Sequence, residues 1–300
     1  MTTPSYDSAT PISAKSLAID LLSTMPPRHP VPVGALVRAA VILGVGENSM
    51  RVALARLRAR GLVRSDERGL YRLGPGAQPV NLHVRSWRDI EERVTSWDGS
   101  WLGLECARGA GSRQAGLAQR LLGFRPLTRG LGLRPNNLEG GVDAVRHRLQ
   151  SLGSDTNAAG LVFRLDELDD ESEQRARGLW DTETLESGYR ETRERLLESE
   201  ARMKGLSREA AMSESFRLGG AALRQIVLDP LLPAPIVDVE ARRQLVSAMR
   251  HYDRVGRRYW KDWAGEVVEL EQSPAAIGGW VANPNTLSAP AMAGQRRREG

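Results

Sequence analysis

The sequence predicts an α+β fold, and three patterns along the chain support that class. Residues 34–76 combine helical stretches with a short hairpin pattern. Residues 97–165 alternate between strand-like and helical segments, and nearly every segment after residue 170 has helical periodicity. Because a chain of 300 residues is long for a single core, these patterns predict separate domains.

Three helices are expected before the hairpin. Residues 15–24 and 34–43 each place apolar side chains on one face, and a proline-rich break at 26–32 separates them. The third helix, 48–60, follows a turn at 44–46. Asn48 or Ser49 is its predicted N-cap, and Gly61 is predicted to end it.

The helix at 48–60 has two different faces. Its apolar stripe, spaced i, i+3, i+4 and i+7, consists of Met50, Ala53, Leu54 and Leu57. The opposite face carries Asn48, Val52, Ala55 and Ala59, and its edges carry Ser49, Arg51, Arg56 and Arg58. Small side chains permit close approach to base edges, and arginine binds guanine or phosphate. This face predicts contact with a DNA major groove, although a solvated helix of a bundle would carry similar arginines.

A short hairpin follows directly. Strands at 62–65 and 70–73 flank a four-residue loop, in which Gly69 is expected to take a positive φ. Three helices followed by a small hairpin predict a winged helix-turn-helix. Arg64 on the first strand and Arg68 at the tip are the predicted contacts to phosphate or to the minor groove.

The middle of the chain predicts a second layered domain. The turn Asp98-Gly99 introduces a strand, and helices at 113–123 and 138–152 alternate with strands at 125–133 and 161–165. This β-α-β-α-β pattern suggests a ferredoxin-like arrangement. Helices are then expected at 171–179, 181–200, 207–228 and 239–270.

The domain boundaries follow from these elements and from composition. Both ends of the chain are rich in Ser, Thr, Pro, Gly or Ala, so we expect them to lack regular structure. Residues 74–79 contain Gly and Pro and are expected to form a linker. The prediction is a disordered arm (1–13), a winged helix-turn-helix domain (14–76), a ferredoxin-like middle domain (77–168), an all-helical C-terminal domain (169–272) and a flexible tail (273–300).

The positive charge is concentrated in the winged helix-turn-helix. Residues 34–76 hold eight arginines and three acidic residues, an excess of five that equals the net charge of +5 of the whole chain. Concentrated arginine is typical of nucleic-acid binding, because each cation placed on a phosphate releases condensed counterions.

Little in the sequence indicates an enzyme. The four histidines have no metal-ligand spacing, Cys106 is the single cysteine, and no phosphate-binding glycine motif is present. We therefore expect no catalytic residue, no metal and no cofactor. No apolar run approaches the roughly 20 residues of a membrane span. Without a secretory signal pattern, and with one thiol, a cytoplasmic location is expected.

Five motifs, in the same order, resemble the phenylacetic-acid degradation repressor (PaaX) family of transcriptional regulators. They are SMRVALARLRARGLV (49–63), WDGSWLGLE (97–105), LLGFRPLTRGLGLRPN (121–136), VFRLDELDD (162–170) leading to WDTETLESGYRE (180–191), and DPLLP (229–233). The resemblance implies a homodimeric repressor that binds a near-palindromic operator in a catabolic gene cluster. It also implies release by an aryl- or acyl-CoA thioester, whose identity stays open because residues 234–238 depart from the usual family pattern.

An effector of that kind would need aromatic and cationic side chains from the middle and C-terminal domains. The candidates are Trp101, Arg125, Arg134, Tyr189, Arg190 and Arg193. Two other classes remain open: a metal-dependent nuclease using Asp98 of the middle domain, and an assembly factor whose winged helix contacts protein.

Overall fold

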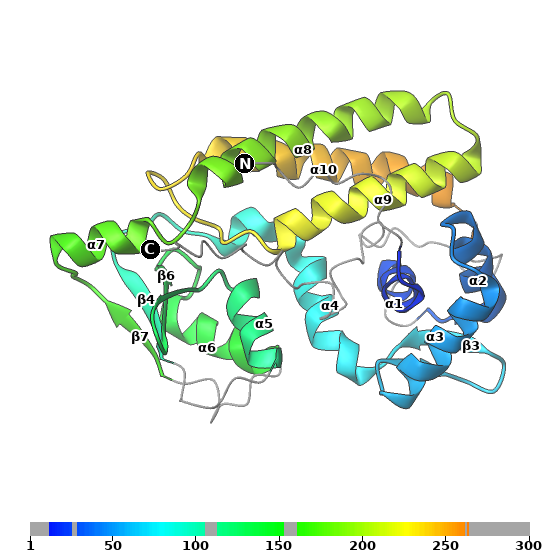
Figure 1. Cartoon of the computed structure of the whole chain (residues 1–300), viewed down its shortest axis with the longest axis horizontal. Helices are drawn as coiled ribbons and strands as arrows, with labels where there is room; N and C mark the ends of the chain where they lie inside the picture. The colour runs from blue at the N-terminus through cyan, green and yellow to red at the C-terminus, as the bar shows by residue number, and fades with distance from the viewer. Residues whose placement is uncertain (1–11, 26–28, 106–112, 153–160, 262, 264–300) are drawn as a thin grey trace, which may run out of the picture.

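The computed structural model describes residues 12–25, 29–105, 113–152, 161–261 and 263, with side chains omitted at 113–115. Three long helices, α8 (Thr182–Met203), α9 (Arg208–Val227) and α10 (Val239–Trp260), lie together along one side of the molecule (Figure 1). The N-terminal helices lie beneath one end of these helices and a four-stranded sheet beneath the other. Helix α4 (Gln78–Arg85) runs between the two parts.

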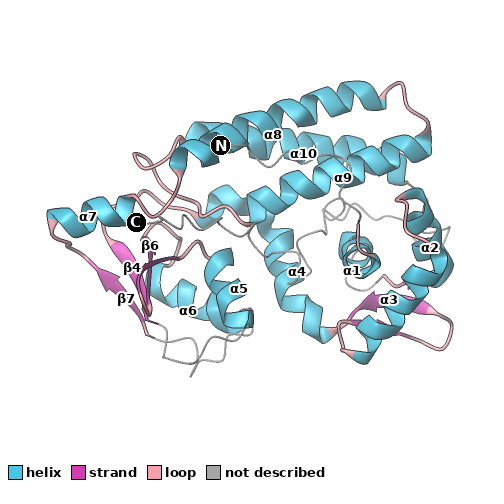
Figure 2. Cartoon of the chain, in the orientation of Figure 1, coloured by secondary structure: helices cyan, strands magenta, loops and turns pink. Residues whose placement is uncertain are grey.

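The N-terminal module contains the three predicted helices and the predicted hairpin. The helices are α1 (Ala14–Thr24), α2 (Val33–Ile42) and α3 (Glu47–Ala59), and the hairpin strands are β2 (Val63–Ser65) and β3 (Leu70–Leu73). A third short strand, β1 (Val31–Pro32), pairs with β3, which gives the antiparallel order β1-β3-β2. Figure 2 shows this small sheet beside α3.

Two local predictions at the start of this module need correction. The N-cap of α3 is Gly46, which makes no side-chain capping bond, rather than Asn48 or Ser49. At the end of the predicted arm, Ile12 is buried and the Ser13 side chain caps α1 by accepting from Ser16 N at 3.1 Å. Residues 1–11 of that arm lie outside the described residues.

The predicted linker at 74–79 is packed structure. The turn η1 (Pro75–Ala77) leads directly into α4, and Ala77 is buried. Gly74 lies so close to the end of α3 that a Cβ there would sit 2.2 Å from the carbonyl oxygen of Gly61. Only glycine fits this crossing, so the base of the hairpin is fixed against the chain that leads out of the module.

In its described residues, the middle part contains four strands, not the three predicted. Its elements are β4 (Trp101–Glu105), α5 (Arg113–Leu121), β5 (Arg125–Thr128), β6 (Leu131–Pro135), α6 (Gly141–Ser151) and β7 (Val162–Leu165). The predicted strand at 125–133 is a hairpin that turns at Gly130, where φ is +96°. The sheet order is β5-β6-β4-β7, all antiparallel. The connectivity is therefore β-α-β-β-α-β.

Helices dominate the remainder, as predicted. Helix α7 (Asp170–Arg177) precedes the three long ones, and α7, α8, α9 and α10 are capped by the side chains of Asp169, Asp181, Ser207 and Asp238. Helix α10 ends ten residues before the predicted 270. Residues 264–300, which include the predicted tail, lie outside the described chain.

Two apolar cores hold these parts together. One joins the four-stranded sheet, α4 and most of the C-terminal helices. The other belongs to the N-terminal module, and it includes Met212 and Phe216 of α9 and Trp260 of α10. The module is therefore docked on the helical part through shared core residues. Among the described residues, no helix combines the length and apolar content needed to cross a membrane.

Candidate functional site

Helix α3 presents the two faces that its sequence predicts. Met50, Ala53, Leu54 and Leu57 are buried against α1 and α2. The opposite face is exposed along its whole length, at Asn48, Ser49, Arg51, Val52, Ala55, Arg56, Arg58 and Ala59. Val52 is 40% exposed although it is apolar. The helix therefore offers solvent a strip of small side chains edged by cations.

The arginines of α3 differ in how they are held. Arg58 donates from Nη1 to Ser65 Oγ of β2 at 3.2 Å, so its guanidinium leans toward the hairpin. Arg51 lies 3.9 Å from Glu47 one turn earlier, and both side chains are exposed. Such exposed pairs contribute little stability, so the Arg51 cation stays available to another anion.

The hairpin that follows α3 has an ordered tip. Asp66 Oδ1 accepts from the backbone amides of Arg68 and Leu70, each at 3.0 Å, and Gly69 has φ of +73° as predicted. The Gly69 carbonyl accepts from Val33 N at 3.0 Å, which ties the loop to the start of α2. Arg64 and Arg68 are exposed on this hairpin. The arginine at the tip therefore stands on a braced turn.

Polar contacts fix the module to the rest of the chain. Arg217 of α9 donates to the carbonyl of Leu43 at 2.8 Å, and Arg85 of α4 donates to the carbonyl of Met25 at 3.2 Å. Within the core of the N-terminal module, the indole N–H of Trp260 donates to the carbonyl of Met212 at 3.2 Å. These bonds and the shared core hold the helices that support α3 against α9, α10 and α4.

Trp101 and Arg134 from the predicted effector set are both buried and hydrogen-bonded within the fold. Trp101 is 1% exposed, stacks on Trp180 at 6.3 Å and donates its indole N–H to Glu173 at 2.7 Å. Arg134 is also 1% exposed and donates to the carbonyls of Leu122 and Pro135 and to Asn137 Oδ1. In the sheet register Arg134 pairs with Leu102, so its side chain lies on the face opposite Trp101.

The remaining effector candidates lie on β5 and α8. Arg125 is half-buried at the start of β5 and donates to Phe124 O at 3.3 Å. On α8, Tyr189 is buried, and burial raises the pKa of its hydroxyl. Its neighbour Arg190 is exposed and pairs with Glu186 at 3.2 Å and Asp238 at 3.7 Å, whereas Arg193 is half-buried.

Asp98 has the geometry of a turn residue. Its Oδ1 accepts from Ser100 N at 3.0 Å and Ser100 Oγ at 2.6 Å, and its Oδ2 pairs with Arg164 at 3.1 Å. The bonds from Ser100 hold the pKa of this carboxyl below its usual range. Across the described part of the chain, no group of three His, Cys, Asp or Glu side chains is placed to hold a metal ion. Cys106 lies outside that part.

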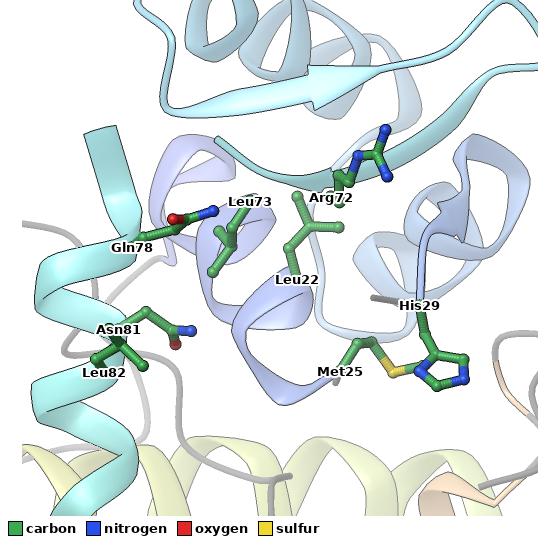
Figure 3. Close-up of a pocket in the computed structure, with 8 residues that line it drawn as sticks. All are labelled: Leu22, Met25, His29, Arg72, Leu73, Gln78, Asn81 and Leu82. Atoms are coloured by element: carbon green, nitrogen blue, oxygen red, sulfur yellow. The ribbon is translucent and has the colours of Figure 1, made fainter. Parts of the chain in front are cut away.

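One feature was absent from the sequence prediction. A pocket opens where the end of α1, strand β3 and helix α4 meet (Figure 3). Its lining comes from three separate parts of the sequence: Leu22, Met25 and His29; Arg72 and Leu73; and Gln78, Asn81 and Leu82. Because no local pattern contains all three, only the folded chain brings them together.

The N-terminal module is similar to a known protein family. Residues 13–75 match the family model of the PaaX-like proteins, which confirms over this stretch the resemblance inferred from sequence motifs. A search of curated proteins found no match. Among solved structures, an uncharacterized protein, Rv0674 from Mycobacterium tuberculosis, is similar with 24% identity and a TM-score of 0.46, covering 82% of this chain and 99% of that one.

Proposed function

We propose that this protein is a sequence-specific, double-stranded DNA-binding transcriptional repressor. The match of residues 13–75 to the PaaX-like family points to a transcriptional regulator. The observation that carries the DNA-binding proposal is the exposed face of α3, where small side chains are edged by Arg51, Arg56 and Arg58. Side chains of this kind read a major groove.

The proposed contacts divide between base reading and backbone positioning. In α3, Asn48, Ser49, Val52 and Ala55 approach base edges, and the arginines reach guanine or phosphate. In the hairpin, Arg64 and Arg68 contact flanking phosphates or the minor groove. The order of three helices and a three-stranded antiparallel sheet supports a winged helix-turn-helix, with the hairpin as its wing.

We assign the remaining segments to dimer formation and control. The β-α-β-β-α-β connectivity of residues 101–165 supports a ferredoxin-like middle domain, followed by a helical C-terminal domain. A two-fold homodimer places its recognition helices about 34 Å apart, or a multiple of that spacing, on a near-palindromic operator. An aryl- or acyl-CoA thioester binds preferentially to another dimer geometry of the protein. The protein then dissociates from the operator of a catabolic gene cluster, as in the PaaX family that this chain resembles.

The DNA-binding proposal is tested by selection from a random double-stranded DNA library with the full chain. The expected result is an enriched near-palindrome whose half-sites repeat at about one helical turn or a multiple of it. The double variant Arg51→Ala/Arg56→Ala loses about 10- to 100-fold in affinity for the enriched site, and its salt dependence becomes shallower by about one to two ions.

The matched control is Arg129→Ala/Arg254→Ala, which removes two exposed arginines outside the module. It is expected to bind the selected DNA as the unaltered chain does. If the Arg51/Arg56 pair behaves like this control, α3 is not the recognition helix, and an assembly role through protein contacts gains support. Titration of the selected complex with a panel of CoA thioesters tests control separately, because a panel without effect removes only the effector proposal.

A further inference from the structure

Helix α3 carries arginines along both edges of its exposed face. At about 100° per residue, Arg51 and Arg58 lie about 70–90° to one side of the strip of small side chains, and Arg56 and Arg60 lie about 70–110° to the other. Arg58 donates to Ser65 of the hairpin, so the first edge faces the wing. A helix about 10–12 Å across fills a major groove about 12 Å wide, so its two edges meet the two sugar-phosphate backbones that border the groove.

On the edge away from the wing, Arg60 has a cationic neighbour on another helix. Lys15 lies in the first turn of α1, and α1 packs against α3 (Figure 1). Burial and, to a smaller extent, the positive charge of Arg60 lower the pKa of the Lys15 amine. Because the charge of Arg60 acts on this amine, the two cations lie near each other. Lys15 is half-buried and Arg60 is exposed, so the pair borders solvent.

No described carboxylate offsets this pair of charges. Neither Lys15 nor Arg60 forms an ion pair with an acidic residue in the described part of the chain. The single acid of α1, Asp20, is buried, and Glu47 lies at the other end of α3 beside Arg51. Two neighbouring cations repel each other, and an anion that contacts both removes the repulsion. Phosphate is the anion that borders a major groove.

We propose that Lys15 and Arg60 together bind a phosphate of the DNA backbone on the side of α3 opposite the wing. This inference rests on the proposed function and extends the DNA-binding surface from α3 and the hairpin to α1. The hairpin arginines then hold one backbone and the Lys15–Arg60 pair holds the other, with α3 in the groove between them. Contacts on both sides fix the orientation of α3, and the pair itself reads no base.

The first test compares the unaltered full chain with Lys15→Gln/Arg60→Gln on the DNA enriched by selection and on a random duplex. The variant is expected to lose about tenfold in affinity for both, and the slope of log affinity against log salt becomes shallower by about two. Sequence preference is retained because both affinities fall equally. Arg129→Gln/Arg254→Gln removes two exposed arginines outside the module and is the matched control, with unchanged affinity and slope. Thermal unfolding checks that each variant is folded.

Neutral phosphates locate the contact. A methylphosphonate, placed at one position in each half-site, removes the charge of one phosphate at a time. The unaltered chain is expected to lose affinity at positions on both backbones. Lys15→Gln/Arg60→Gln is expected to become insensitive at a position on one backbone, and the wing variant Arg64→Gln/Arg68→Gln at a position on the backbone across the groove.

The proposal is overturned if folded Lys15→Gln/Arg60→Gln keeps the affinity and salt slope of the unaltered chain. It is also overturned if the loss is confined to the enriched sequence, or if this variant and the wing variant become insensitive at the same phosphates. In these cases the unaltered chain still binds its selected DNA, so the proposed function stands. An unaltered chain that binds no double-stranded DNA removes the proposed function, and the phosphate contact with it.

Discussion

The N-terminal module and the rest of the described chain differ in whether they bury any arginine. The eight arginines between residues 34 and 76 are all exposed, at 38, 51, 56, 58, 60, 64, 68 and 72. In the other parts, Arg134 and Arg242 are buried and donate to backbone carbonyls, and Arg88 pairs with the buried Asp253. Arginine is thus exposed throughout residues 34–76, whereas the rest of the described chain has exposed arginines and also a few that support its interior.

This difference shows that arginine content alone does not identify a binding surface. Burial lowers the pKa of Arg134 to about 9 and that of Arg93 to about 10, because a buried cation loses its hydration. Such a cation is kept in place by acceptors around it and has little left to offer a ligand. An exposed guanidinium can exchange water for phosphate, so exposure and pairing separate the two roles.

The largest expected effect on stability comes from replacing a buried arginine. Arg134→Met leaves three buried acceptors, Leu122 O, Pro135 O and Asn137 Oδ1, without their donor. We expect the free energy of unfolding to fall by about 3 kcal/mol or more, measured by urea denaturation. Arg129→Met at the exposed β5–β6 turn is the control, with an expected change within about 0.5 kcal/mol. Equal effects at the two positions would mean that burial does not distinguish these arginines.

A smaller effect of opposite sign is expected where the module meets α9. Asp20 of α1 is fully buried, and neither carboxylate oxygen has a hydrogen-bond partner in the described structure. Burial raises the pKa of Asp20 well above its usual value, and the charge of Arg224 opposes that rise. Asp20→Asn is therefore expected to increase the free energy of unfolding at pH 7 by about 1–2 kcal/mol.

The pH dependence of Asp20 follows from the same shift. At a pH below about 3.9 the Asp20 carboxyl is protonated in both the folded and the unfolded state, so its ionisation does not lower the free energy of unfolding. As the pH rises, the unfolded state loses its proton first, and stability falls until the raised folded pKa is reached. Denaturation over this range should show a flatter profile for Asp20→Asn, whereas Asp143→Asn at an exposed site should leave the profile unchanged. A profile unaltered by Asp20→Asn would contradict the raised pKa.

Much of the module could be predicted because its signals are local. The stripe Met50, Ala53, Leu54 and Leu57 repeats at helical spacing, and Gly69 takes the positive φ that its hairpin requires. The N-cap was mispredicted because Asn48 and Ser49 are good capping residues, yet the helix starts after Gly46. Propensity at a terminus is easily overridden by the turn that precedes it.

Features that depend on contacts between distant parts of the sequence could not be predicted from local sequence patterns. The sequence at 125–133 predicts one strand, since the turn of the hairpin is only the short pair Arg129-Gly130. The burial of Arg134 depends on carbonyls from Leu122 and Pro135, and the pocket depends on α1 meeting α4. A charged residue in a sequence carries no sign of whether the fold will surround it with acceptors.

A modest effect is expected at the braced tip of the wing. Asp66→Ala removes the acceptor shared by the amides of Arg68 and Leu70. Because the site is exposed, we expect a loss of about 1 kcal/mol or less and about fivefold faster amide hydrogen exchange at these two positions. Asp66→Asn keeps an acceptor and should retain most of the protection, and Glu67→Ala is the exposed neighbour control. Unchanged exchange in Asp66→Ala would show that the backbone turn holds the tip alone.

The smallest expected effect on stability is at Val52, on the exposed face of α3, and it tests whether that residue contacts a base. Val52 is 40% exposed and packs little, so Val52→Ala should change the free energy of unfolding by less than about 0.5 kcal/mol. If the valine contacts a thymine methyl, the variant should lose about threefold in preference at one base position of the selected DNA and retain the others. An equal loss of base preference at all positions would instead mean that Val52 supports the overall packing of α3 against the DNA and reads no single base. Since stability is untouched in either case, the selection profile alone separates a reading residue from one that is merely exposed.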